Sequence, residues 1–214
     1  MNCFPSLVLM AVVLLPLLSA CSSPTIEQQP ASEFAAEGLH EVTGTGFESA
    51  FVLPGANLPG YARIQFEPFD ASDVDVGSTT LTGTTRSDWQ INDEREQKLV
   101  AAWVKATSHA FADYPREEGA DKILRVEAAL SRLSPGRSTN TSTATVGSSS
   151  SANRDVVNVS VEMRLFDAGS GQLLAVVRDR QSVGAQQWSR TAGTDMTNLF
   201  NSWAALLHTR VSGR

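Results

Sequence analysis

The stretch "DVVNVSVEMRLFDAGSGQLLAVVRDRQ", Asp155 to Gln181, decides the fold. In its first part, apolar residues at the odd positions from 157 to 165 alternate with polar residues at the even positions between them. Strict alternation predicts a β-strand with one buried face and one face in solvent. The turn-forming residues 167–171 include two glycines, and an apolar strand returns after them. The stretch therefore predicts an antiparallel β-hairpin.

Two more strands are predicted before the hairpin. "DKILRVEAALSRL", Asp121 to Leu133, alternates in the same way, and "YARIQFEPF", Tyr61 to Phe69, is shorter and contains a strand-ending proline. A short strand near 75–81 is an open alternative to a turn-rich connection. Residues 134–154 are dominated by Ser, Thr, Gly and Asn, which bury little apolar surface, so we expect a disordered loop there.

Two amphipathic helices are also predicted. Asn92 is a favourable N-cap, and acidic residues follow it in the first turn, where the helix dipole favours negative charge. Apolar residues then recur at helical spacing, and "GTDMTNLFNSWAALLHTRV", residues 193–211, shows the same spacing near the end of the chain. Trp103 and Trp203 lie on the two apolar faces, so we expect both in the core.

These elements together predict an α+β fold of the two-layer sandwich type. Half-solvated strands favour a mainly antiparallel sheet, of about four to five strands, with the two helices on its buried face. The folded domain would span 60–214 and would include the loop at 134–154. Its early strand, from Tyr61 onwards, is expected at an edge of the sheet.

The N-terminal segment has the features of an export signal. "LVLMAVVLLPLL", Leu7 to Leu18, is too short for a transmembrane helix, which needs about 20 apolar residues, but it suits the apolar core of a signal peptide. Small residues follow it, so residues 1–20 are predicted to be a signal peptide. The motif "LSAC", Leu18 to Cys21, then resembles the lipobox of bacterial lipoproteins.

The resemblance to the lipobox implies that Cys21 begins the mature chain and carries the lipid. In that class a diacylglyceryl group joins the cysteine sulfur and the new amino terminus is acylated, with palmitate among the acyl chains. Each buried CH₂ contributes about 0.8 kcal/mol, so several chains give a lasting anchor. Ser22, where an Asp would signal inner-membrane retention, resembles outer-membrane sorting in a Gram-negative bacterium. Residues 21–59 would then be the lipidated cysteine and a flexible tether that lets a periplasmic domain clear the bilayer.

Four segments also resemble an uncharacterised family of small proteobacterial lipoproteins, the domain-of-unknown-function family DUF3313. They are "ARIQFEP", "ADKILRVEAALSRLSP", "VEMRLFDAGSGQLLAVVRDR" and "NLFNSWAALLHTRV". The match covers roughly residues 40–212, and its most specific parts are the hairpin turn and Trp203. The family implies a lipid-anchored periplasmic domain without an established activity, and it assigns no residue roles.

The sequence offers no recognisable catalytic constellation. A net charge of −6 disfavours a nucleic-acid partner, because phosphate binding needs a basic surface. Cys3 lies in the signal segment, so the domain itself has no cysteine, and the three histidines are isolated. We therefore predict no metal and no cofactor. The carboxylates of Glu127 and Glu162 lie on polar strand faces with arginines close by, which we interpret as cross-strand ion pairing.

The leading hypothesis is a lipid-anchored, non-enzymatic envelope module that binds an envelope protein or polymer. Trp89 and Trp188 lie near helix starts and are candidates for a partner surface. One alternative is an envelope enzyme with an unrecognised polar site on the hairpin face. Another is a structural scaffold that oligomerises through an exposed strand edge.

Overall fold

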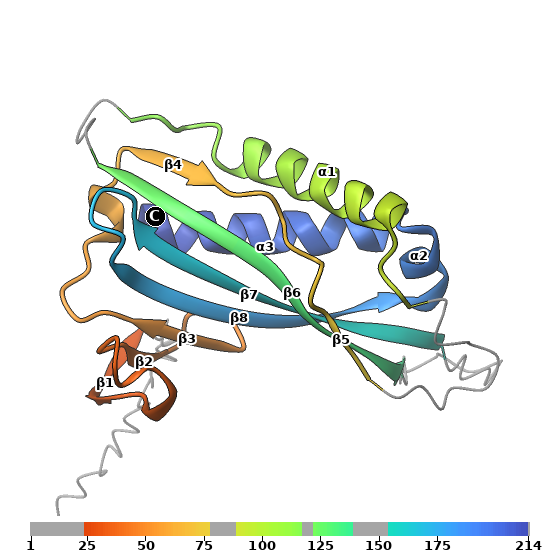
Figure 1. The fold of residues 1–214 in the computed structure, drawn as a ribbon, viewed down its shortest axis with the longest axis horizontal. Helices are drawn as coiled ribbons and strands as arrows, with labels where there is room; N and C mark the ends of the chain where they lie inside the picture. Colours follow the sequence, from red (N-terminus) through yellow and green to blue (C-terminus); the bar gives the residue numbers. More distant parts are fainter. Residues whose placement is uncertain (1–23, 78–88, 117–121, 139–153, 214) are drawn as a thin grey trace, which may run out of the picture.

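The computed structural model describes residues 24–77, 89–116, 122–138 and 154–213 of the chain. Over these residues the fold is one mixed β-sheet of eight strands with three α-helices (Figure 1). The strand order is β1-β2-β3-β8-β7-β6-β4, and β5 also pairs with β6. The broad α+β class is correct, but the smaller sandwich, with a sheet of four to five strands, is wrong.

The predicted hairpin forms the centre of the sheet. Its strands are β7 (Arg154–Asp167) and β8 (Leu173–Gly184), and β6 (Ile123–Ser138) pairs with the other side of β7. Both of these pairings of β7 are antiparallel. In β7, and in β6 from Leu124 to Leu130, the buried residues are the ones that the alternation predicted, whereas a register shift after Leu130 places Leu133 in the core as well. At the turn, Gly171 has φ +75°, a conformation that favours glycine.

Parallel pairing is the first difference from the expected sheet. β4 (Arg63–Phe66) and β5 (Asp75–Val76) both run parallel to β6, and β4 ends the strand order, as expected for an edge strand. Helix α1 (Asp93–Ala110) lies between these strands and β6 in the chain. Parallel neighbours need a crossover connection, which is usually a helix. The order strand, helix, strand was therefore a signal for parallel pairing that the alternation of single strands did not carry.

The segment that was expected to be a tether belongs to the sheet. β1 (Thr25–Pro30), β2 (His40–Thr43) and β3 (Ser49–Val52) form an antiparallel extension in which β3 pairs with β8. The tether prediction for 21–59 is therefore wrong for its described part. β8 supplies main-chain partners to β3, which in turn pairs with β2, and Val42, Phe47 and Ala50 of this segment are buried in the main core. We call residues 24–53 the N-terminal unit.

The loop predicted at 134–154 also begins later than expected. Residues 134–138 belong to β6, and Gly136 pairs with Val156 in the ladder between β6 and β7. Main-chain hydrogen bonds hold this stretch in the sheet although it has few apolar side chains to bury. The rest of the predicted loop, 139–153, lies outside the described residues.

Helices α1 and α3 (Thr194–Ser212) pack together over one face of the sheet, and the short α2 (Ala185–Arg190) connects β8 to α3 (Figure 1). Asn92 caps α1 as predicted, since its Oδ1 accepts a hydrogen bond from the Arg95 backbone N–H at 2.8 Å. Trp103 and Trp203 are 1% and 0% exposed, so the core prediction for both is confirmed.

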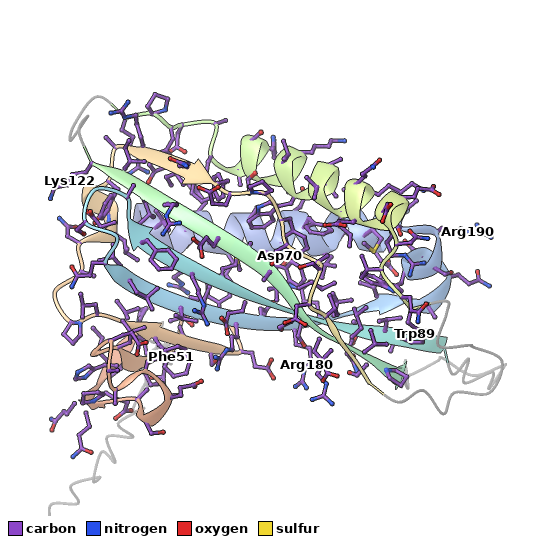
Figure 2. The ribbon with its side chains drawn as sticks, in the orientation of Figure 1. Phe51, Asp70, Trp89, Lys122, Arg180 and Arg190 are labelled. Atoms are coloured by element: carbon purple, nitrogen blue, oxygen red, sulfur yellow. The ribbon has the colours of Figure 1, made fainter. Side chains whose placement is uncertain are left out.

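The opposite face of the sheet has a second, smaller apolar cluster. It consists of Phe34, Leu39, Phe51 and Val176. Three of these residues come from the N-terminal unit, and Val176 comes from β8. Figure 2 shows Phe51 in the part of the molecule remote from α1. The N-terminal unit thus covers one part of the face that the helices leave free, and the remainder of that face is polar.

Candidate functional site

The two tryptophans proposed as a partner surface are buried. Trp89 and Trp188 are each 1% exposed and belong to the main core, so the prediction that they form an exposed surface is wrong. The structure does bring both residues to one polar cluster. Each is followed by a residue whose main-chain carbonyl accepts a hydrogen bond from Arg95, namely Gln90 and Ser189.

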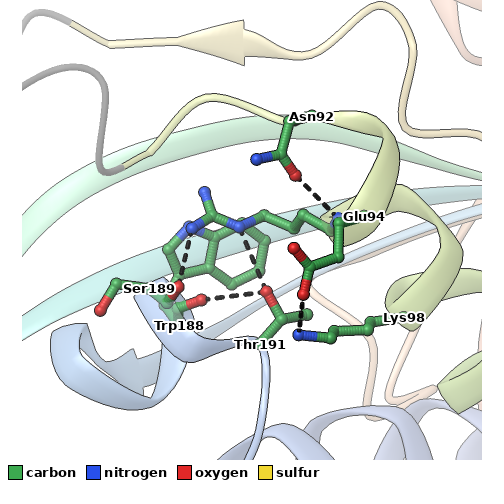
Figure 3. Close-up of polar contacts among 7 residues, drawn as sticks. Asn92, Glu94, Lys98, Trp188, Ser189 and Thr191 are labelled. Atoms are coloured by element: carbon green, nitrogen blue, oxygen red, sulfur yellow. Dashed lines mark hydrogen bonds and ion pairs between the residues drawn. The ribbon is translucent and has the colours of Figure 1, made fainter.

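Arg95 joins the first turn of α1 to the end of α2 (Figure 3). Its guanidinium donates to the Gln90 carbonyl at 2.6 Å, to the Ser189 carbonyl at 2.9 Å and, through Nε, to the Thr191 hydroxyl at 3.1 Å. It also lies 5.8 Å from the centre of the Trp188 ring. A cation suits the C-terminal end of a helix, where carbonyls are left unpaired. This cluster is therefore a structural clamp, and sequence reasoning missed it because nothing marks Arg95 as buried.

The polar part of the other sheet face carries charged side chains on three adjacent strands. We call this surface the open face; it consists of Arg125 and Glu127 on β6, Glu162 and Arg164 on β7, and Arg178 on β8. Glu162 accepts from Arg164 and from Arg178, each at 2.7 Å. Cross-strand pairing is thus confirmed for Glu162 with Arg178, whereas Arg164 pairs with Glu162 along β7 and Arg125 pairs with Glu127 along β6.

Arg178 joins the open face to the N-terminal unit. Besides Glu162, it bonds to Glu33 at 2.8 Å, and its guanidinium lies 5.4 Å from the Phe34 ring and 5.7 Å from the Phe51 ring. Burial raises the pKa of Glu162, but the hydrogen bonds from its arginine partners outweigh this and hold the pKa below its usual value of 4.5. The open face is therefore a set of charges that are already paired at neutral pH.

Asp179 is a buried carboxylate on β8. It is 8% exposed and accepts hydrogen bonds from the Trp203 indole N–H at 2.8 Å and from Gln181 at 3.1 Å. Gln181 in turn donates to Ser202 on α3 at 2.9 Å. A buried carboxylate needs such partners, so this network ties α3 to β8 rather than forming a reactive site.

At the hairpin turn, Asp167 accepts from the Tyr61 hydroxyl at 2.7 Å and from the backbone and side chain of Ser170. The bond from Tyr61, followed by those from Ser170, lowers the pKa of Asp167 to about 2. Burial, with the neighbouring carboxylate, raises the pKa of Tyr61. The prediction of a turn at residues 167–171 agrees with this geometry.

Three further predictions concern the lipid site, metal binding and membrane-spanning helices. Cys21 and Ser22 lie outside the described residues. His208 lies against Asp113 at 2.8 Å, and no group of three or more His, Cys, Asp or Glu side chains within the described ranges could hold a metal ion. Of the helices described, none is both long and apolar enough to cross a membrane.

The chain is thus an α+β protein with one large mixed sheet, covered by helices on one face. No family model and no curated protein matches it. Among solved structures, a protomer of the PelC dodecamer from Paraburkholderia phytofirmans is similar with a TM-score of 0.39 and 8% identity, covering 77% of this chain and 98% of that one. A candidate lipoprotein from Caulobacter crescentus is similar with a TM-score of 0.34 and 15% identity, and the match covers 74% of this chain and 94% of that one. Similarity at this level concerns the general arrangement of strands and helices only.

Proposed function

We propose that this chain is a lipoprotein anchored in the bacterial outer membrane through Cys21, and that its periplasm-facing domain is a non-enzymatic binding or accessory module. The lipobox-like motif supports the anchor, and Ser22 supports the sorting. The observation that carries the binding role is the open face. Its side chains are reachable from solvent, with Arg164 48% and Glu127 40% exposed, and neither helix of the main core covers them.

The charge pattern of the open face suits a partner that is polar along its length. Three arginines and two glutamates alternate over adjacent strands, so an envelope protein or polymer that offers both acceptors and donors can extend the existing pairs. An isolated anion fits less well, because Glu162 and Glu33 together already neutralise Arg164 and Arg178. Recognition of this kind gives specificity more than strength.

An envelope enzyme with a polar site on the same face is the alternative. A general acid or base works best when its pKa is moved towards the working pH. Glu162 is the less exposed carboxylate of the open face, and its pKa is moved the other way. The open face therefore favours recognition over proton transfer. An oligomeric scaffold is a further candidate, favoured by the position of β1 and β4 at the two ends of the described strand order.

Site-specific photo-crosslinking in intact cells tests the binding role. A photoreactive amino acid would replace Arg164 on the open face and, as the matched control, the exposed Lys105 on α1. We expect a discrete crosslinked product at position 164 that is absent at 105. Equal products at both positions, or a product at 105 alone, would contradict the proposal. A ladder of products containing only this chain would favour the scaffold instead.

A further inference from the structure

The fold begins very close to the proposed lipid site. β1 starts at Thr25, four residues after Cys21. A fully extended chain spans at most 3.3–3.6 Å per residue, so these two positions are at most about 14 Å apart. The expected tether, which would have given tens of residues of slack, is occupied by β1, β2 and β3.

This span is comparable to the thickness of the lipid surface itself. The headgroup region occupies about 5–8 Å on each side of the hydrocarbon core. An acylated Cys21 lies at the inner boundary of that region, so β1 can stand away from the lipid surface by about 10 Å or less. That distance is about one Debye length at physiological ionic strength, so charges on the N-terminal unit act on the membrane surface.

The strand nearest the anchor exposes an apolar side chain. All six residues of β1 are exposed, and Ile26 is 49% exposed. Among the described residues, the other large apolar side chain with comparable exposure is Val104, at 53%, on α1. Figure 1 shows α1 and β1 on opposite sides of the molecule. An apolar side chain held at this depth is favoured in the boundary between headgroups and acyl chains.

The net negative charge of the chain comes mostly from the same region. Residues 1–62 contain five glutamates and no lysine or arginine, so they carry −5 of the total −6. Glu33 and Glu48 are neutralised by arginines of β8, whereas Glu27, Glu37 and Glu41 are exposed. Anionic headgroups would repel this surface, so a zwitterionic lipid surface is the one that it fits.

We propose that the β1 edge of the sheet rests on the bilayer that holds the anchor, with Ile26 among the headgroups of zwitterionic lipid. The proposal rests on the proposed function, because without acylation at Cys21 nothing holds β1 at a membrane. The domain then lies directly against the membrane and is not separated from it by a long flexible tether. The β4 edge, at the other end of the strand order, is the edge of the sheet that lies away from the bilayer.

Spin labelling of the mature lipoprotein tests this arrangement. Cys3 is removed with the signal peptide and the Cys21 sulfur is blocked by its lipid, so Ile26→Cys introduces the sole free thiol of the mature chain. A nitroxide is attached there and, as the matched control, at Val104→Cys. The proteins are reconstituted in phosphatidylcholine vesicles, and collisions with a water-soluble nickel reagent are compared with those of unanchored Cys21→Ser forms produced without residues 1–20, which also lack Cys3. A third form carries a 20-residue Gly/Ser linker between Ser23 and Pro24.

We expect a several-fold loss of nickel collisions at position 26 in vesicles, no change at 104, and recovery at 26 when the linker is present. An acylated protein whose label at 26 is as accessible as in the Cys21→Ser form would overturn the membrane contact and leave the anchor intact. A mature chain without acyl mass on Cys21 would overturn the proposed anchor, and the membrane contact with it.

Discussion

The two faces of the sheet are held by different means. The face under α1 and α3 is closed by a continuous core with several aromatic rings, among them Trp103 and Trp203. The face under the N-terminal unit is closed by four apolar residues and by the ion pairs of Arg178. Burial of large apolar side chains dominates folding energies, whereas exposed ion pairs contribute little. The first face should therefore unfold with the whole domain, and the second should be able to open alone.

Truncation of a core side chain between the sheet and the helices should lower the free energy of unfolding most. Trp203→Ala removes a side chain with no exposed surface and should lower the free energy of unfolding by about 3–5 kcal/mol. Trp203→Phe keeps most of the ring but leaves Asp179 without its indole donor, which should cost about 1–3 kcal/mol. Urea unfolding measures both. Equal losses for the two variants would show that the hydrogen bond, not the packing, holds α3.

Truncation of an apolar side chain in the N-terminal unit should lower the stability less, and the loss should stay local. Phe51 packs on Phe34 with ring centres 4.9 Å apart, so Phe51→Ala should cost about 3 kcal/mol, at the lower end for such changes. Hydrogen exchange should speed up in β1, β2 and β3 while the amides of β6 and β7 keep their protection. Loss of protection across the whole sheet would contradict the independence of the two faces.

Loss of the Arg178 ion pairs should lower the stability by a smaller amount again. Arg178→Met removes the pairs to Glu33 and Glu162 and should destabilise the N-terminal unit by about 1 kcal/mol, since the side chain is partly exposed. Arg164→Met is the matched control, because it also loses a pair to Glu162 but touches no residue of the N-terminal unit in the contacts described. Exchange rates in β2 should rise only for the first variant. The same rise in both would assign the effect to net charge.

The smallest effect should be a pH dependence carried by Glu162. Burial raises its pKa, but the arginine bonds outweigh this and lower it from 4.5. A carboxyl whose pKa is lowered by folding stabilises the protein above its unfolded pKa, and this contribution is lost as the pH falls through the folded value. Glu162→Gln should therefore be less stable than the parent chain at pH 7, with the difference shrinking below pH 4.5. A difference that grows on acidification would reverse the sign of this argument.

The centre of the fold could be predicted from the sequence, but the N-terminal unit could not. The hairpin was predictable because each residue from Val157 to Leu165 reports which face it occupies. The N-terminal unit was not, because β2 and β3 are four residues each, too short to show a period. Their position depends on main-chain pairing of β3 with β8 and of β2 with β3, which no side-chain pattern records.

The candidate site shows the same limit. The charged residues of β6 and β7 in the open face were predicted from alternation, because a polar residue between two buried ones must face away from the core. Arg178 was not, because β8 does not alternate. Trp89 and Trp188 were proposed as a partner surface because they lie near helix starts. Both are buried in the main core, and tertiary contacts between distant segments leave no trace in local spacing.

The account depends most on the N-terminal unit being part of the folded domain. Native-state hydrogen exchange of the mature protein tests this directly at residues 40–53. We predict strong protection for the β3 amides that bond to β8, and for the Leu53 N–H, which donates to the Leu174 carbonyl at 2.8 Å. Exchange of these amides at the rate of an unstructured chain would restore the tether and contradict both the second cluster and the membrane contact derived from it.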